Sequence, residues 1–312
     1  MIVCLAANPS IDRLFEIERL VRGDIHRPAG FVQTAGGKGL NVARAARALG
    51  ADAAAVALLR GHAGAWLEEQ LAAEGVAGSF VWTHGENRSS LSVADRETGG
   101  LTEFYEHGSI VPTAAWVELM HAAASRFAPG AWLTISGSLP RGVPDEGYRE
   151  LVAEAREAGV RVAVDCDGER LRLALEAHPD VVKVNTTEAR ELLGVPTARQ
   201  EESMAAARKL RQLAGGDGHA GVVTRGAEGV VLAAPDGTLY EGMLYVRGRY
   251  PVGSGDAFLA GLVAGLDRGE DWDASLAIAL GAATANAEIP GGGRLDPARA
   301  QELAARAEVR MV

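Results

Sequence analysis

A short run in the last quarter of the chain, Gly253-Ser254-Gly255-Asp256, combines small residues with one carboxylate. Residues 257–266 behind it are apolar with helical spacing, so the run lies at the start of a helix. The first four N–H groups of a helix have no partner within it and carry partial positive charge, which favours an anion that small residues allow to approach. We therefore expect an anion site here, of the kind that stabilises a phosphoryl group during transfer.

Asp256 is the carboxylate of this turn. The helix dipole is expected to keep it ionised, and an ionised carboxylate beside a phosphate pocket can accept the proton of an attacking hydroxyl. A plainer interpretation is that Asp256 only favours the helix start and that the glycines only make a turn. This stretch by itself does not separate the two interpretations.

A second glycine cluster, Gly36-Gly37-Lys38-Gly39, opens another helix, which ends at Gly50. Its spacing matches neither the phosphate loop of P-loop enzymes nor the dinucleotide fingerprint, and alone it indicates only a turn. Two such clusters, each following extended structure and one of them carrying a lysine, instead predict a site built from two distant parts of the chain.

The elements that must position these clusters alternate along most of the sequence. Buried strand-like runs are separated by helical segments of about 10–15 residues, which predicts right-handed crossovers and a mainly parallel sheet covered on both faces. Strands are expected at 2–7, 54–59, 79–83, 131–135, 160–164, 181–184, 221–224, 229–233 and 238–246. The first of them should end in a loop at 8–12, and the C-terminus should be helical at 274–288 and 297–308.

Four segments that are more polar than these strands break the alternation. Residues 14–18 and 29–34 are short and lack helical period, and 90–94 with 101–106 form a hairpin around a Gly99-Gly100 turn. We expect these segments to pair as a small accessory sheet.

Charge and composition exclude several classes of protein. The formal net charge of −10 argues against nucleic acid or an anionic membrane surface as a partner, since both need a basic footprint. No run approaches the roughly 18 apolar residues of a membrane span, and the chain enters a strand at once without a charged leader. The two cysteines, Cys4 and Cys166, lie in apolar runs as expected of buried thiols, and none of the seven histidines has a metal-ligand spacing with another. A cytoplasmic location is therefore expected.

The two glycine clusters, extended to Gly36–Ala43 and Gly253–Phe258, resemble the two signatures of the PfkB (ribokinase-like) carbohydrate kinases. Stretches 136–140, 183–188 and 224–229 follow in the order of that family, each at the C-terminal end of an expected strand. The resemblance covers essentially the whole chain. It implies an α/β fold, the ribokinase-like three-layer α/β/α sandwich with a mainly parallel central sheet, as a single domain over 1–312. A small β-sheet lid would come from about 13–35 and 88–107.

Residue by residue, the resemblance implies the following roles. Asp256 would be the base, and the amides of Gly253, Ser254 and Gly255 would form the anion hole. The sugar would be bound by Asp12, Gly37, Asn41, Ser136 and Gly137, and the phosphate that it carries by Lys38 and Arg88. ATP would be bound by Lys183, Asn185, Glu188, Thr224, Gly226, Gly229 and Asn286. Mg²⁺ would be held through water by Asn185 and Glu188.

Four of these residues also have plainer interpretations. Arg88 could be a solvated charge at a strand edge, and Glu188 could simply favour a first helical turn. Asn41 could cap a helix, and Asp12 could be a turn residue.

Within the family, Asn8–Asp12 and Arg88–Ser90 resemble the phosphosugar branch, the 1-phosphofructokinases and tagatose-6-phosphate kinases. We therefore expect ATP-dependent transfer to a hydroxyl of a ketohexose phosphate. One alternative is a kinase of an unphosphorylated sugar or nucleoside, which would have no use for Lys38 and Arg88. Another is a catalytically silent binder of nucleotide or sugar, which would be expected to have lost the base or the anion hole.

The sequence departs from the family pattern in two places that bear on function. Tyr250-Pro251 stands where the second signature usually begins with Asp-Thr or Asn-Thr, beside the loop that holds a monovalent cation in many relatives, so the need for such a cation stays open. Tyr105 stands where the phosphosugar branch commonly has Asn, which leaves the choice of sugar open. An exposed lid sheet has unpaired edges and an apolar face, which predicts a homodimer through the lids.

Overall fold

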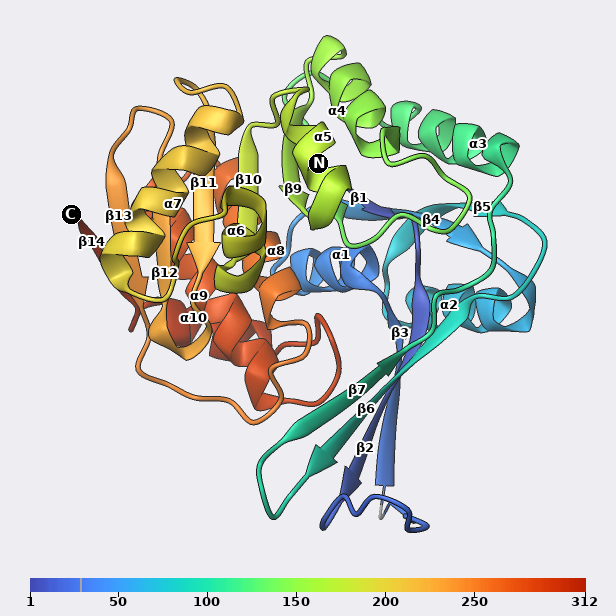
Figure 1. Ribbon diagram of the computed structural model, residues 1–312. Helices are drawn as coiled ribbons and strands as arrows, with labels where there is room; N and C mark the ends of the chain where they lie inside the picture. The colour runs from blue at the N-terminus through green and yellow to red at the C-terminus, as the bar shows by residue number, and fades with distance from the viewer. Residues whose placement is uncertain (29) are drawn as a thin grey trace.

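The large sheet runs through the centre of the computed structural model, which describes residues 1–28 and 30–312 (Figure 1). Among these residues, ten strands pair in the order β14-β13-β12-β11-β10-β9-β8-β1-β4-β5. Pairing is parallel from β5 to β11 and antiparallel from β11 to β14. The strands are β1 (Ile2–Ala6), β4 (Ala53–Leu59), β5 (Ala77–Trp82), β8 (Trp132–Ser136), β9 (Arg161–Asp165), β10 (Val181–Asn185), β11 (Ala220–Thr224), β12 (Val230–Ala233), β13 (Leu239–Met243) and β14 (Glu308–Met311).

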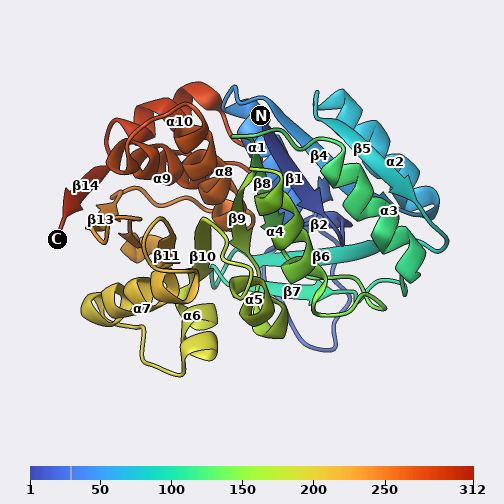
Figure 2. The ribbon, with the colours of Figure 1, turned by 90° about the horizontal axis from the view of Figure 1, so that it is seen from above.

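Helices cover both faces of this sheet, as Figure 2 shows with α8 to α10 on one side and α5 to α7 on the other. Successive side chains of a strand point to opposite faces, so Ile2 and Cys4 of β1 join one hydrophobic core while Val3 and Leu5 join the other. The helices are α1 (Lys38–Ala48), α2 (Gly61–Ala73), α3 (Thr113–Ala124), α4 (Gly147–Glu157), α5 (Gly168–Leu175), α6 (Thr186–Leu193), α7 (Gln200–Leu213), α8 (Ser254–Asp267), α9 (Trp272–Glu288) and α10 (Pro297–Ala304), with a 3₁₀ turn η1 at Gly226–Glu228.

A small sheet projects from one end of this body, at the bottom of Figure 1. Its strands are β2 (Ser10–Ile17), β3 (Gly30–Gly36), β6 (Arg88–Asp95) and β7 (Leu101–Tyr105), in the order β3-β2-β6-β7. The expected pairing of the four polar segments is thus found, with β2 and β6 parallel and the other pairs antiparallel. Ala29, where the expected strand 29–34 began, lies outside the described residues. The division of the chain into one domain with a lid over about 13–35 and 88–107 stays a prediction.

Two sequence expectations are wrong at the ends of elements. The loop expected at 8–12 is shorter, because β2 pairs on both sides, with β3 and β6, from Ser10 onward. The last helix ends at Ala304 rather than at 308, because Glu308–Met311 pairs with the otherwise open edge of β13, where Arg310 Nη2 lies 2.7 Å from Glu241 Oε2. Nowhere in residues 1–28 and 30–312 is there a helix with both the length and the apolarity to cross a membrane.

Candidate active site

A cleft opens where the carboxyl ends of the central strands meet the small sheet, with a cavity volume of about 940 Å³. Parallel strands place all their carboxyl ends on one edge of a sheet, and this edge collects residues that are far apart in the sequence. Most of the predicted site residues line the cleft: Asp12, Gly37, Lys38, Asn41, Arg88, Ser136, Gly137, Lys183, Asn185, Glu188, Thr224, Gly226, Gly253, Ser254, Gly255 and Asp256.

The start of α8 forms one wall of the cleft, and its conformation requires a glycine at 253. Gly253 caps the helix with a φ of 81°, a left-handed conformation that favours glycine. A Cβ on Gly255 would come within 3.0 Å of the Nζ of Lys183. The amide of Ser254 donates to the carbonyl of Pro251 at 3.1 Å, so the turn uses it internally. The anion hole of Gly253, Ser254 and Gly255 stays a prediction.

Asp256 is buried, with 5% of its surface exposed, and its Oδ2 accepts a hydrogen bond of 2.8 Å from Nδ2 of Asn41. Burial raises the pKa of Asp256 to about 7, although Lys38 and this hydrogen bond act in the opposite direction. The raised pKa differs from the expectation that the helix dipole keeps this carboxylate ionised, because desolvation outweighs the favourable charges in setting the pKa. A carboxylate with a pKa near the working pH is suited to exchange a proton.

Asp165, which the sequence analysis missed, lies at the end of β9 and is fully buried between two lysines. Its Oδ2 is 2.5 Å from Nζ of Lys183, and its Oδ1 is 3.1 Å from Nζ of Lys38. Burial alone would raise the pKa of Asp165, but the two ammonium groups outweigh it and lower the pKa. A carboxylate directly after a buried strand, at the edge where ligands bind, is the signal that could have found it.

Asn185 and Glu188 form a reciprocal cap at the start of α6. Oδ1 of Asn185 accepts from the amide of Glu188 at 2.9 Å, and Oε2 of Glu188 accepts from the amide of Asn185 at 2.8 Å. Glu188 therefore does stabilise the first turn of a helix, as the plainer interpretation states. Its other oxygen, Oε1, lies 3.6 Å from Nζ of Lys38, so the same carboxylate also faces the cleft.

The residues present fit a hydrated Mg²⁺ rather than a closed metal cage. In the described part of the chain, no group of three or more His, Cys, Asp or Glu side chains is arranged to hold a metal. Mg²⁺ keeps several waters and is usually bound by one or two carboxylates together with substrate phosphates. Glu188 and Asn185 offer oxygen atoms of that kind at the cleft wall.

On the opposite wall, Asp12 lies in strand β2, so it is not a turn residue. Its carboxylate accepts hydrogen bonds from Oγ of Ser10 at 2.5 Å and from the amide of Gly37 at 3.3 Å, and desolvation raises its pKa. Asn41 lies inside α1, whose N-cap is Gly37, so the interpretation of Asn41 as a helix cap is wrong. Asn41 and Gly37 connect the small sheet to α8 across this wall.

Arg88 begins β6 and is bound to its surroundings, not solvated at a strand edge. Its Nε donates to the carbonyl of Asn8 and its Nη1 to Oγ of Ser90, each at 3.2 Å. Desolvation lowers its pKa, although the nearby carboxylate of Asp12 acts in the opposite direction. Lys38, by contrast, is bound to Asp165 near Glu188. Both residues line the cleft, and their predicted convergence on one phosphate stays a prediction.

Two predicted nucleotide ligands, Asn286 and Gly229, have structural contacts of their own, and their role toward ATP stays a prediction. Asn286 is fully buried, and its Nδ2 donates to the carbonyl of Val252 at 2.9 Å, so it supports the loop before α8. Gly229 has a φ of 89°, and a Cβ there would strike the carbonyl of Gly242, so backbone packing explains this glycine. Neither residue lines the cavity.

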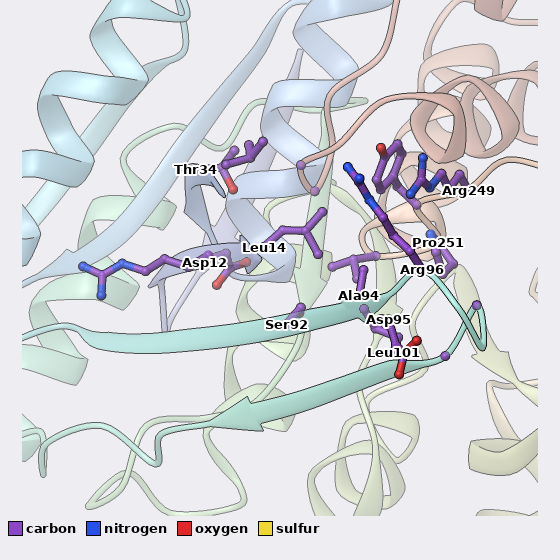
Figure 3. Close-up of a pocket in the computed structure, with 18 residues that line it drawn as sticks. Asp12, Leu14, Thr34, Ser92, Ala94, Asp95, Arg96, Leu101, Arg249 and Pro251 are labelled. Carbon is purple, nitrogen blue, oxygen red and sulfur yellow. The ribbon is translucent and has the colours of Figure 1, made fainter. Parts of the chain in front are cut away.

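A second cavity of about 220 Å³ adjoins the cleft between the small sheet and the segment that leads to α8. Figure 3 shows Asp12 and Thr34 at one end, and Arg96, Arg249 and Pro251 at the other. Beside it, the hydroxyl of Tyr250 donates to Oε1 of Glu16 at 2.8 Å, and Nη2 of Arg96 donates to Oε2 of Glu16 at 2.8 Å. The unusual Tyr250 therefore joins the small sheet to the loop of the predicted anion hole.

Comparisons with known proteins show the family and the fold. Residues 5–299 match the model of the pfkB family carbohydrate kinases, and the chain belongs to this family. A 1-phosphofructokinase of Rhodobacter capsulatus is 32% identical over 90% of each chain. A tagatose-6-phosphate kinase of Staphylococcus epidermidis is 29% identical over 85% of each chain.

Among solved structures, phosphofructokinase-2 of Escherichia coli in complex with substrates and products superposes with a TM-score of 0.90 at 26% identity, covering 97% of this chain and 98% of that one. The ribokinase of Arabidopsis thaliana shares the fold with a TM-score of 0.75 at 21% identity, covering 97% and 98%. The predicted family, the ribokinase-like α/β fold and the class of carbohydrate kinase are confirmed.

Proposed function

We propose that the protein is an ATP-dependent kinase that transfers the γ-phosphoryl group to a hydroxyl of a ketohexose phosphate, with fructose 1-phosphate and tagatose 6-phosphate as the first candidates. The observation that carries the proposal is the pairing of two features in one cleft. Asp256 is a buried carboxylate with a pKa near neutrality at a helix start, and Arg88 is a held guanidinium that faces the same space. The names of the curated relatives support the same substrate class.

In this mechanism the residues act mainly by positioning and by charge. Asp12 and Asn41 orient the sugar so that one hydroxyl faces Asp256, which accepts its proton as the new O–P bond forms. Backbone amides at the start of α8 stabilise the charge on the phosphoryl group in transfer. Arg88 binds the phosphate that the sugar already carries, by its planar fork.

The donor side of the cleft is proposed to bind ATP with Mg²⁺. Lys183, Thr224 and Gly226 line the cleft, and Lys38 lies beside both Asp165 and Glu188. Mg²⁺, when bound, would offset the charge of the phosphates, and Asn185 and Glu188 would hold it through water.

The test is an ATP-consumption assay over a panel of sugars and sugar phosphates. We expect a ketohexose phosphate to exceed free fructose, free ribose and nucleosides by at least about 10-fold in kcat/KM, the worth of one charged hydrogen bond of roughly 1.5 kcal/mol. A nucleoside or a free sugar as the best substrate would overturn the phosphosugar assignment and leave the family assignment intact.

We further propose a homodimer through the small sheet. Phe31 and Phe104 of this sheet are 63% and 57% exposed, and an exposed sheet with large apolar side chains is a common association surface. Sedimentation equilibrium at micromolar concentration should give twice the mass of the chain. A monomer at that concentration would contradict the dimer, and Phe104→Glu should weaken it.

A further inference from the structure

Arg44 is a buried arginine on α1 that no part of the proposed mechanism uses. It is 6% exposed, and all three nitrogen atoms of its guanidinium donate hydrogen bonds. Nε donates to Oε2 of Glu74 at 2.7 Å, and Nη2 donates to the carbonyl of Ala35 at 2.5 Å. Nη1 donates to the carbonyl of Gly292 at 2.8 Å and to Oδ1 of Asn41 at 3.2 Å. Arginines are seldom buried unless paired, so this site is specifically built.

The contact with Asn41 decides which way the Asn41 amide points. A guanidinium has only donors, so the atom of Asn41 that faces it must be the oxygen. The amide nitrogen must then face the other way, where Nδ2 donates to Oδ2 of Asp256 at 2.8 Å. A flipped amide would set an oxygen against a carboxylate oxygen and leave the Arg44 donor facing an N–H.

Arg44 also holds the backbone beneath the start of α8. The carbonyl that it binds belongs to Gly292, and a Cβ added at Gly253 would strike the backbone of Gly292. One side chain thus connects α1, the end of β3, the residue that follows α2 and the loop on which Gly253 packs.

We propose that Arg44 is a positioning residue for the reaction, acting through Asn41 to keep a hydrogen-bond donor on the Asp256 carboxylate. The inference rests on the proposed role of Asp256 as the base. Without Arg44 the amide can flip or move away, and the carboxylate loses a donor that favours its ionised form. The base should then take up a proton at higher pH than in the wild-type enzyme.

Other charged groups also face Asp256, and they stay in place when Arg44 is changed. Lys38 comes from α1, Asp165 from the end of β9, and Lys183 from β10. Their contributions are common to the wild type and to the variants below, so a difference between the enzymes reports the Asn41 link.

The experiment compares the pH dependence of kcat in the wild type, Arg44→Lys, Asn41→Ala and the double variant. A lysine keeps the charge, but its single ammonium group cannot donate to all four acceptors that the planar guanidinium of Arg44 reaches. At low pH, kcat should fall as the base takes up a proton, and we call the midpoint of this fall the acidic limb. We expect Arg44→Lys and Asn41→Ala each to raise the pH of the acidic limb by about one unit, the effect of roughly one hydrogen bond to a charged group. The double variant should shift no further than Asn41→Ala alone. Arg47→Met, an exposed arginine of the same helix, is the matched control and should leave the limb unmoved.

The possible outcomes separate the inference from the function on which it rests. An unmoved limb in Asn41→Ala overturns the inference, even if Arg44→Lys proves unable to fold. An equal loss of kcat at every pH in Arg44→Lys, or a further shift in the double variant, overturns it as well. If instead Asp256→Asn keeps its activity, the proposed base is wrong and the limb belongs to another group.

Discussion

Two buried carboxylates lie at the same edge of the large sheet, and their surroundings shift the two pKa values in opposite directions. Asp165, at the end of β9, is bonded to the ammonium groups of Lys38 and Lys183, and its pKa is lowered. Asp256, at the start of α8, is bonded to the neutral amide of Asn41, and its pKa is raised to about 7. Residue type and burial are alike, so the neighbouring charges and the hydrogen-bond partners make the difference.

The comparison indicates that the two carboxylates have different roles in the cleft. Asp165 is a fixed negative charge that holds two lysines where phosphates would bind. Asp256 can gain and lose a proton near neutral pH, as a general base must. Removing one should therefore harm the architecture of the site, and removing the other should harm the reaction.

The largest effect is expected from Asp256→Asn, which keeps the shape of the side chain and removes the proposed base. We expect kcat to fall by roughly 10²–10⁴, the usual worth of general base catalysis, while the affinities for ATP and sugar stay near those of the wild type. Steady-state kinetics with isothermal titration of both ligands measures this. A variant with more than about a tenth of the wild-type kcat would remove Asp256 from the role of base.

Asp165→Asn should act on stability instead. It leaves the buried Lys183 without a counter-charge, and breaking a buried pair in this way costs about 3–5 kcal/mol. Chemical denaturation at pH 7 measures the loss, and Asp167→Asn, an exposed carboxylate two residues further on, is the control. An unchanged free energy of unfolding would contradict the structural role of Asp165.

Asp165 and Asp256 should also contribute to the pH dependence of folding stability in opposite directions. The folded state lowers the pKa of Asp165, so its stabilisation is present above the unfolded pKa of about 4 and is lost as the pH falls through the folded pKa. The folded state raises the pKa of Asp256, so the wild type loses stability as the pH rises between about 4 and about 7. Thermal unfolding at pH 5 and pH 8 should therefore show Asp256→Asn gaining on the wild type at pH 8. A wild type that gains on Asp256→Asn over this range would contradict the raised pKa.

A smaller and more selective effect is expected from Arg88→Ala. One charged hydrogen bond contributes about 1.5–3 kcal/mol, so kcat/KM for a sugar phosphate should fall by roughly 10–10² while that for free fructose stays unchanged. Arg13→Ala, an exposed arginine of the same small sheet, is the control. An equal loss on both substrates would return Arg88 to a structural role.

The smallest effect is expected from Tyr250→Phe, which removes only the hydroxyl that donates to Glu16. A neutral-to-charged hydrogen bond at a partly exposed site is worth about 1 kcal/mol, or roughly a 5-fold change. Because the bond joins the small sheet to the loop before α8, the KM for the sugar should rise while the KM for ATP stays the same. Tyr240→Phe on β13 is the control, and a change in the KM for ATP would contradict the proposed link.

The sequence by itself determined which residues collect in the cleft. Glycines before apolar helical runs marked the starts of α1 and α8, and the alternation of strands and helices implied a parallel sheet. Parallel strands have their carboxyl ends on the same edge, so Lys183 of β10 and Thr224 of β11 were expected to lie close together. These are local patterns, and local patterns are readable along a chain.

The tertiary structure decided what each side chain does once it is there. Asn41 and Asp256 are 215 positions apart, and only folding brings the amide to the carboxylate and removes the water that would otherwise keep it ionised. Asn286 is fully buried, and a Cβ on Gly229 would strike the carbonyl of Gly242, and both contacts are made with distant parts of the chain. Hydrogen-bond partners and desolvation arise from contacts between distant segments, and those contacts leave no periodic trace in the sequence.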